Sequence, residues 1–131
     1  VMPCATQNEV EIADAKNIVA NNVKYYVEVS NMPTTAEAVA YLKENGVVIA
    51  PSKAVNAGGV AVSGLEMSQN SMRYSWTAEE VDAKLHQIMT NIFKASYEAA
   101  EKYGMKGDLI AGANIAGFLK VAEAMKAQGV V

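Results

Sequence analysis

Three short polar segments carry most of the side chains that could bind a ligand. They are PCATQN (3–8), SNMPTT (30–35) and APSKAVNAGG (50–59). All three are rich in hydroxyl and amide side chains and poor in charge, which suits hydrogen bonds to ribose, amide or phosphate groups. The third runs into a predicted helix whose first turn contains Gly58 and Gly59. Each glycine costs a helix about 1 kcal/mol, so the pair indicates that something comes very close to the backbone there.

The start of that helix has a functional and a structural interpretation. Asn56 is a favoured N-cap residue, and free amides of Gly58 and Gly59 at the positive helix end would stabilise a polar or anionic ligand. Ser63 and Val60 share one face of the helix with these glycines. The alternative is close helix packing, with the Ser63 hydroxyl bonded back to its own backbone. Spacing alone leaves both interpretations open.

The remaining reactive side chains give weaker indications. His86 lies in the middle of a helix among polar residues, which favours an exposed or packing role. Cys4 follows a proline at a strand end, where a small buried hydrophobe is favoured over a low-pKa thiol. Lys53 is the only lysine of the three segments, without a visible partner for a reactive amine. No acid/base pair is recognisable among Glu9, Glu28 and Glu66.

The composition is that of one globular domain with few specialised ligands. The chain has 131 residues, 51% of them hydrophobic, and a net charge of −3 with scattered lysines, so no nucleic-acid surface is expected. A single Cys and a single His argue against a zinc site, and the lone Cys fits a reducing cytoplasm. No apolar run reaches the roughly 20 residues of a membrane span.

Hydrophobic periodicity places the three polar segments on a βαβ unit. It predicts, in order, a helix in 8–22, a strand at 25–29, a helix at 34–45 that stops at Gly46, and a strand at 47–50. Short connections make the strands parallel and the fold α/β. Val1 and Met2 read as the end of an earlier strand, so the chain is expected to be a piece of a longer protein. The polar segments would then meet at the carboxyl edge of the tail of a doubly wound sheet.

Three helices are predicted after this unit. The first follows Gly59. The second begins at Thr77, with Glu80 completing a capping box, and ends at Gly104. The third runs from about residue 108 to 128, and its small-residue run contains Gly112 and Gly117. These two glycines would let neighbouring backbones approach closely.

Four motifs, in this order and spacing, resemble one family of enzymes. PCATQNE, SNMPTT, APSKAVNAGGVAVSGLEMSQN and AGANIAGF are similar to the C-terminal part of the small hexameric glutamate dehydrogenases of bacteria. Such enzymes interconvert L-glutamate and 2-oxoglutarate plus ammonia with NAD or NADP, as cytoplasmic homohexamers. The resemblance implies that residues 1–55 are the end of a Rossmann-like nucleotide-binding domain. It implies that residues 56–131 are the cleft helix and the helices that close the molecule.

The resemblance also implies two sets of binding residues. On the substrate side, the Ser63 hydroxyl would bind the side-chain carboxylate of glutamate, and Val60 would pack on its methylenes. The cofactor side, along the ribose and the nicotinamide, would consist of Ala5, Thr6, Asn31 and Asn56. The family's Gly-rich fingerprint, catalytic lysine and catalytic aspartate would all precede residue 1. No catalytic residue and no metal ligand are therefore expected in this chain, which should be inactive by itself.

Two other functions stay open at this point. A dehydrogenase for leucine, phenylalanine or valine would share the fold, but a Ser63 hydroxyl facing an apolar side chain would be left unpaired. A stand-alone nucleotide-binding or oligomerisation module would need no catalytic residues at all.

Overall fold

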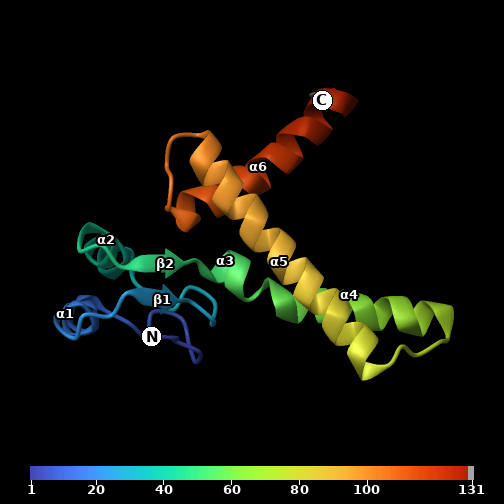
Figure 1. Ribbon diagram of the computed structural model, residues 1–131, viewed down its shortest axis with the longest axis horizontal. Helices are drawn as coiled ribbons and strands as arrows, with labels where there is room; N and C mark the ends of the chain where they lie inside the picture. Colours follow the sequence, from blue (N-terminus) through green and yellow to red (C-terminus); the bar gives the residue numbers. More distant parts are fainter. Residues whose placement is uncertain (130–131) are drawn as a thin grey trace.

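The computed structural model describes residues 1–129, in which a βαβ unit lies beside long helices that extend away from it (Figure 1). The elements are α1 (Ile12–Ala20), β1 (Tyr25–Val27), α2 (Ala36–Glu44), β2 (Val48–Ala50), α3 (Ser52–Val55), α4 (Ala57–Met72), α5 (Ala78–Lys102) and α6 (Leu109–Gln128). The predicted α/β class, a parallel βαβ unit followed by helices, is confirmed. The short helix α3 corrects the sequence-based prediction, which treated residues 50–57 as a loop. None of the described helices is long and apolar enough to cross a membrane.

The sheet has β1 in its centre. β1 and β2 are parallel, with Tyr26 opposite Ile49. On the other side of β1, the chain start runs alongside it: the Val1 amino group donates to the Tyr25 carbonyl at 3.0 Å, and the Val27 amide donates to the Val1 carbonyl at 2.9 Å. Residues 1–3 therefore pair with β1 as the end of a parallel strand would. This agrees with the sequence-based prediction that Val1 and Met2 end an earlier strand.

The helices α1 and α2 cover one face of this sheet and enclose the core. Tyr26 and Leu42 are fully buried between the strands and these helices. The Tyr26 hydroxyl lies 2.8 Å from the Thr34 hydroxyl oxygen, so the one polar atom of this buried ring is paired. Burial raises the pKa of the Tyr26 phenol above its ordinary value, although the Thr34 hydrogen bond partly opposes that effect.

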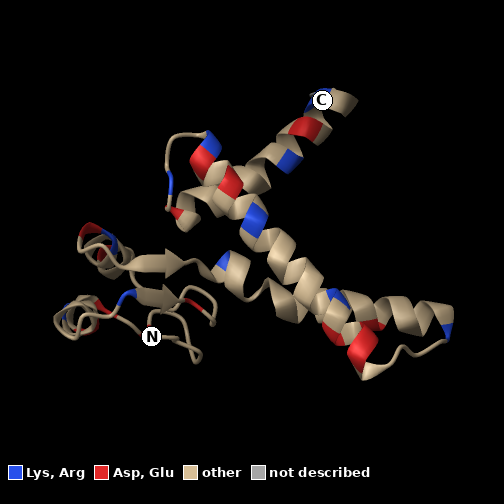
Figure 2. Cartoon of the chain, viewed as in Figure 1, with Lys and Arg blue, Asp and Glu red and all other residues tan. Residues whose placement is uncertain are grey.

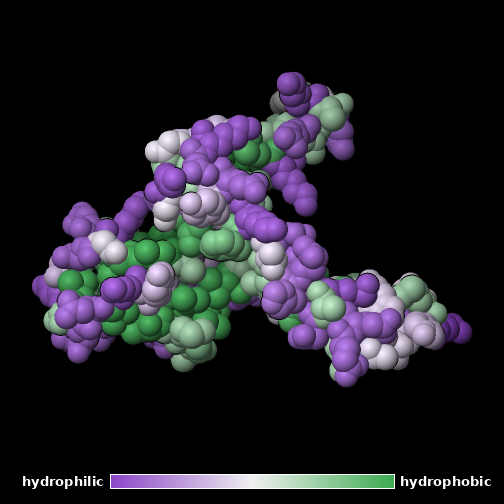
Figure 3. All heavy atoms as spheres, viewed as in Figure 1, coloured by the Kyte–Doolittle hydropathy of each residue, from purple (hydrophilic) through white to green (hydrophobic). Residues whose placement is uncertain are grey.

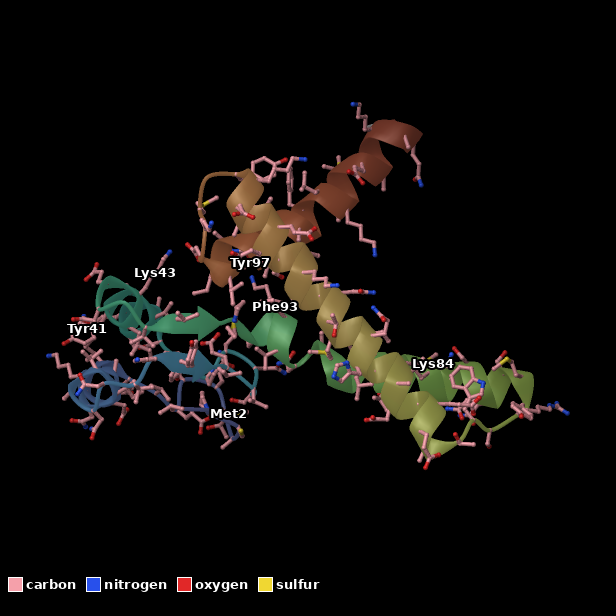
Figure 4. All side chains as sticks on the ribbon, viewed as in Figure 1. Met2, Tyr41, Lys43, Lys84, Phe93 and Tyr97 are labelled. Atoms are coloured by element: carbon pink, nitrogen blue, oxygen red, sulfur yellow. The ribbon has the colours of Figure 1, made fainter. Side chains whose placement is uncertain are left out.

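The opposite face of the sheet is apolar and only partly covered. Tyr25 is 66% exposed, and Phe93 of α5 is 57% exposed. With Val48 and Tyr97, these residues line an apolar groove between the strands and α5. Phe93 and Tyr97 lie on the α5 segment nearest the strands, and hydrophobic surface gathers over this region (Figures 3 and 4). Because parallel sheets are normally buried on both faces, the described residues leave part of this one without its usual cover.

Local signals set the helix ends as predicted. At the start of α5, the Thr77 side chain accepts from the Glu80 amide at 3.2 Å, and the Glu80 carboxylate accepts from the Thr77 amide at 2.8 Å. This is the predicted capping box. Gly46 and Gly104 follow the ends of α2 and α5 with φ of +77° and +78°, a conformation that glycine adopts without strain.

The α5–α6 crossing depends on Gly112. A Cβ atom at this position would lie 1.9 Å from the backbone carbonyl oxygen of Ser96 and 3.0 Å from the Ala100 side chain. The close approach predicted for Gly112 is therefore confirmed. The same prediction for Gly117 is wrong within residues 1–129, because a Cβ atom there meets nothing within 4 Å. Gly117 lies on the exposed side of α6.

One ion pair ties the βαβ unit to α6. Lys43 points from α2 toward the start of α6 (Figure 4), and its ammonium donates to Asp108 Oδ2 at 2.5 Å. Asp108 Oδ1 also caps α6 by accepting from the Ala111 amide at 3.0 Å. Partial burial raises the pKa of the Asp108 carboxyl, but the bonds from Lys43 and from the Ala111 amide outweigh it, so the pKa lies below the ordinary 3.8.

Replacing Asp108 with asparagine should destabilise the chain at neutral pH and not in acid. Asparagine keeps an oxygen for the Ala111 amide, so only the ion pair is lost. That costs about 0.2–1 kcal/mol, because the Lys43 side chain is 55% exposed and solvent screens the pair. A carboxyl group whose pKa is lower in the folded than in the unfolded chain stabilises the fold at pH values above its unfolded pKa. This stabilisation is lost as the pH falls through its folded pKa. Urea unfolding should therefore separate Asp108→Asn from wild type at about pH 7, and the separation should shrink as the pH falls through the folded-state pKa of Asp108.

The more exposed Lys106–Glu101 pair supplies the control for this measurement. Its side chains are 72% and 50% exposed, so Glu101→Gln should change stability little at either pH. A difference between Asp108→Asn and wild type that stays constant from neutral to acid pH would show that the ion pair does not contribute.

Candidate functional site

The three polar segments meet in an open cleft at the carboxyl end of the sheet. The cleft is lined by Cys4, Ala5, Val29, Ser30, Asn31, Asn56 and Val60. The predicted gathering of these segments at one edge is thus confirmed. Of the six predicted binding residues, four line the cleft: Ala5, Asn31, Asn56 and Val60. The other two are not among the lining residues: Thr6 directly follows Ala5, and Ser63 lies on the same helix as Val60.

Two asparagines join the second segment to the third. The Asn56 side-chain amide donates to the Asn31 side-chain oxygen at 2.6 Å. The prediction that the Asn56 side chain caps α4 is therefore wrong, because this side chain makes no capping hydrogen bond to the start of the helix. Asn56 instead lies at the junction of α3 and α4, where it ends one helix and precedes the other. The Asn56 side-chain amide therefore binds a residue of another cleft segment and not the backbone of its own helix.

A buried carboxylate holds α3 in place. Glu28 follows β1, is only 7% exposed, and accepts the Ser52 amide at 3.1 Å. Ser52 is the first residue of α3, so this bond fixes where the short helix begins. Sequence reasoning found no role for Glu28, and local sequence offers none, since its partner is 24 residues away.

The two glycines at the start of α4 have different surroundings. A Cβ atom at Gly58 would lie 3.3 Å from Met89 Sδ and 3.4 Å from Leu85 Cδ1, both on α5. Gly58 therefore allows close helix packing, the structural interpretation. A Cβ atom at Gly59 meets nothing within 4 Å among the described residues. The expectation of a free amide at Gly59 is wrong, because this amide donates to the Asn56 carbonyl at 3.1 Å.

Beyond the cleft, one face of α4 is open to solvent. Val60 and Met67 are 73% and 71% exposed, and Gly59 and Ser63 are exposed beside them. The Ser63 hydroxyl donates to the Gly59 carbonyl at 3.2 Å. This is the backbone bond of the structural interpretation, but among residues 1–129 this face lacks the close packing that the interpretation assumed. An exposed apolar and hydroxyl-bearing face next to a polar cleft is suited to a ligand that is polar at one end.

The cleft is polar without being charged. None of its lining residues is Lys, Arg, Asp or Glu. The nearby strands also carry no charged side chain, and charges lie mainly on the helices and loops (Figure 2). Such a surface can hydrogen-bond a sugar or an amide. A phosphate is normally bound by Lys or Arg or by free amides at a helix start, and the Gly59 amide at the start of α4 is already bonded to the Asn56 carbonyl. The geometry therefore matches the uncharged part of a nucleotide better than its phosphates.

Comparison with known proteins identifies the family. Residues 1–129 match the Glutamate/Leucine/Phenylalanine/Valine dehydrogenase family. The chain belongs to this family. It is 66% identical over 131 residues to the NAD-specific glutamate dehydrogenase of Clostridium symbiosum, and 58% identical to the NADP-specific glutamate dehydrogenase of Giardia intestinalis. These alignments cover 99% and 100% of this chain but only 29% of each relative. The chain thus spans less than a third of the length of these relatives.

Solved structures of the dehydrogenase family share the fold. A glutamate dehydrogenase with 66% identity superposes with a TM-score of 0.95 over 99% of this chain and 29% of its own. The glutamate dehydrogenase of Peptoniphilus asaccharolyticus, at 33% identity, gives 0.86 over 98% of this chain and 31% of its own. The resemblance stated from four motifs is therefore confirmed at the level of the family and the fold.

The predictions for the remaining reactive residues of this chain have mixed outcomes. His86 is exposed, as expected. Cys4 is also exposed, which contradicts its interpretation as a buried hydrophobe; its thiol donates to the Met2 carbonyl at 3.2 Å. Lys53 donates to the side-chain oxygen of Asn114 on α6, so its ammonium is used between helices. No group of three His, Cys, Asp or Glu within residues 1–129 is placed to hold a metal ion.

Proposed function

We propose that this chain is part of an NAD- or NADP-dependent glutamate dehydrogenase, which oxidatively deaminates L-glutamate to 2-oxoglutarate and ammonia. The observation that carries the proposal is the match over nearly the whole chain to glutamate dehydrogenases at up to 66% identity. The polar cleft with an open helix face beside it supports the proposal independently, because a cofactor and a substrate need adjoining sites.

On the cofactor side, the cleft would bind the nicotinamide and its ribose. Ala5 and the neighbouring Thr6 would lie along the ribose, with Asn31 near it and Asn56 at the nicotinamide. The neutral, amide-rich lining supports this part of the cofactor. Phosphate groups would be bound by residues outside this chain. Residues 1–55 would then complete a Rossmann-like nucleotide domain, and residues 56–131 would supply the cleft helix and the closing helices.

On the substrate side, α4 would present Ser63 and Val60 to glutamate. Val60 lines the cleft, and Ser63 is one turn further along, about 4.5 Å on the helix axis. A substrate lying against this face could place its α-carbon near the nicotinamide and its distal carboxylate near the hydroxyl. The exposed Val60 side chain would pack on the methylenes between them.

Further polypeptide would complete the enzyme. The partly uncovered apolar face of the sheet supports this, since Tyr25 and Phe93 need cover. The catalytic lysine and aspartate would come from that further polypeptide. We also propose a cytoplasmic homohexamer. A hetero-hexameric glutamate dehydrogenase from Thermus thermophilus, 26% identical with a TM-score of 0.88 over 99% of this chain and 30% of its own, supports assembly of that size.

A chimera tests the function directly. In it, this chain replaces the matching residues of the Clostridium symbiosum enzyme, which supplies the remaining length. We expect glutamate-dependent NADH production by the chimera and none by the purified 131-residue chain alone, because the chemistry needs groups that the chain lacks. NADH absorbance with glutamate, leucine, phenylalanine and valine as substrates provides the measurement.

The outcomes separate the alternatives. Activity with leucine or phenylalanine and not with glutamate would favour a sister dehydrogenase of the same family. A folded chimera that oxidises none of the four amino acids would contradict the proposal. A folded isolated chain that binds NADH with the affinity of the chimera would favour a stand-alone nucleotide-binding module.

A further inference from the structure

Glu9 joins two of the three segments that form the cleft. Its Oε1 atom accepts two hydrogen bonds, from the Ala5 amide at 2.9 Å and from the Ser30 hydroxyl at 3.1 Å. Ala5 belongs to the loop after the chain start, and Ser30 belongs to the loop after β1. One oxygen atom thus joins the two loops, in addition to the backbone bonds between them. Glu9 itself is not among the residues that line the cleft.

The positions of its two donors make this contact important for the cleft. Ala5 and Ser30 both line it, and Ser30 precedes Asn31, which is paired with Asn56. The Glu9 contact therefore joins the first segment to the second, and the asparagine pair joins the second to the third. Without the Glu9 acceptor, residues 5–7 would lose this contact. The bonds from the Ser30 amide to the Pro3 carbonyl and from the Asn8 amide to the Met32 carbonyl, and the asparagine pair, would stay in place.

The two loops also contain strained backbone. Asn8 and Met32 have φ of +55° and +48°, in the left-handed region that side chains disfavour, and Met32 precedes Pro33, which restricts its backbone further. The Asn8 amide donates to the Met32 carbonyl at 2.9 Å, so the strained residues face each other across the two loops. Such conformations persist only where surrounding contacts hold them. An ionised carboxylate is a strong acceptor for that purpose.

We propose that Glu9 is a positioning residue that holds residues 3–8 and 30–35 in the arrangement that binds the nicotinamide riboside part of the cofactor. This assignment rests on the proposed function. Glu9 acts through the Ala5 amide and the Ser30 hydroxyl and does not contact the cofactor. Both hydrogen bonds end on Oε1, and Oε2 has no hydrogen-bond partner among the described residues, so a side chain that keeps one acceptor oxygen at this place can keep both contacts.

The test compares Glu9→Ala with Glu9→Gln in the chimera. Alanine removes both bonds, whereas glutamine keeps an oxygen in the Oε1 position. We expect Glu9→Ala to weaken NADH binding about tenfold, the effect of losing a hydrogen bond to a charged group. Glu9→Gln should restore the dissociation constant to within about threefold of wild type, since a neutral acceptor is roughly half as strong. Fluorescence titration with NADH measures the binding, and steady-state kinetics measure kcat and the KM values for NAD and for glutamate.

Glu44→Ala is the matched control. Glu44 is also exposed, but it ends α2 at the opposite end of the sheet, so NADH binding should be unchanged. A parallel rise in the KM of NAD and of glutamate, or a Glu9→Gln variant as weak as Glu9→Ala, would overturn the assignment. A wild-type chimera that binds NADH without activity contradicts the proposed function alone. A wild-type chimera that binds no NADH overturns both.

Discussion

Replacing Gly112 with alanine should lower the free energy of unfolding of this chain by about 2 kcal/mol. The added methyl group would lie 1.9 Å from the Ser96 carbonyl oxygen and 2.9 Å from its carbon. Both atoms are backbone, so no side-chain rotation relieves the overlap, and α5 and α6 must separate. Overpacking of a tight contact costs about 1–3 kcal/mol, more for backbone, and the better helix propensity of alanine recovers about 1 kcal/mol. Urea unfolding followed by far-ultraviolet circular dichroism measures the change.

Gly117 on the same helix supplies a control of opposite sign. A methyl group there meets nothing within 4 Å of the described residues. Gly117→Ala should therefore stabilise the chain by about 0.5–1 kcal/mol through helix propensity alone. If both variants unfold at the same urea concentration, the tight α5–α6 crossing does not exist in solution. Neither residue lies near the cleft, so stability is the only property that should separate them.

These two glycines also show what sequence could and could not predict. Their common setting in the run AGANIAG predicted the same role for both. The difference between them arises because Gly112 faces α5 and Gly117 faces away, and the rotation of α6 is set by packing. By contrast, the Thr77–Glu80 capping box was predictable, because both partners lie within one helical turn.

Prediction from neighbouring residues failed where a residue far away in the sequence binds the side chain or amide in question. Asn56 has the residue type and the position of a helix cap, yet its amide binds Asn31, which is 25 residues away. Likewise, α3 was missed because a four-residue helix has almost no periodicity. Its first amide is bound by Glu28, which is 24 residues away. In both cases the deciding contact joins the ends of two parallel strands, and only the assembled sheet brings those ends together.

The location of the cleft, however, followed from simple rules. A parallel βαβ unit gathers the residues after each strand at one edge, and four of the six predicted binding residues line the cleft there. The roles of Glu9 and Glu28 did not follow, because each acts through backbone amides or hydroxyls of other segments. A sequence pattern can indicate the groups that contact a ligand. It indicates less readily the groups that hold those contacts in place.

For Ser63, a proposed substrate-binding residue, the structure and the family resemblance give its hydroxyl different partners. Its single hydroxyl proton is used in the bond to the Gly59 carbonyl. To donate to a carboxylate, the side chain must rotate away from that carbonyl. The rotation costs little, because both residues are exposed and water can replace the lost bond. The bond from Ser63 to the Gly59 carbonyl is therefore compatible with a ligand-free state, and a bound carboxylate would replace this carbonyl as the acceptor.

Ser63→Ala in the chimera should lower kcat/KM for glutamate by about tenfold to hundredfold. A hydrogen bond to a charged group contributes about 1.5–3 kcal/mol, and each 1.4 kcal/mol corresponds to a factor of ten. Norvaline, which has no distal carboxylate, should lose nothing, because it never uses the hydroxyl. Steady-state kinetics with both substrates at saturating NAD measure the two ratios, and the ratio between them isolates the side-chain carboxylate.

Ser68→Ala is the matched control for this experiment. Ser68 is also an exposed serine of α4 that donates to the carbonyl four residues earlier, that of Gly64, at 2.9 Å. Five residues beyond Ser63, it projects from a different face of the helix. Its removal imitates the loss of a serine–backbone bond without touching the proposed substrate face, so both substrates should keep their kcat/KM. If Ser63→Ala lowers kcat/KM for glutamate and norvaline equally, the hydroxyl has only its bond to Gly59, and glutamate is recognised by other residues.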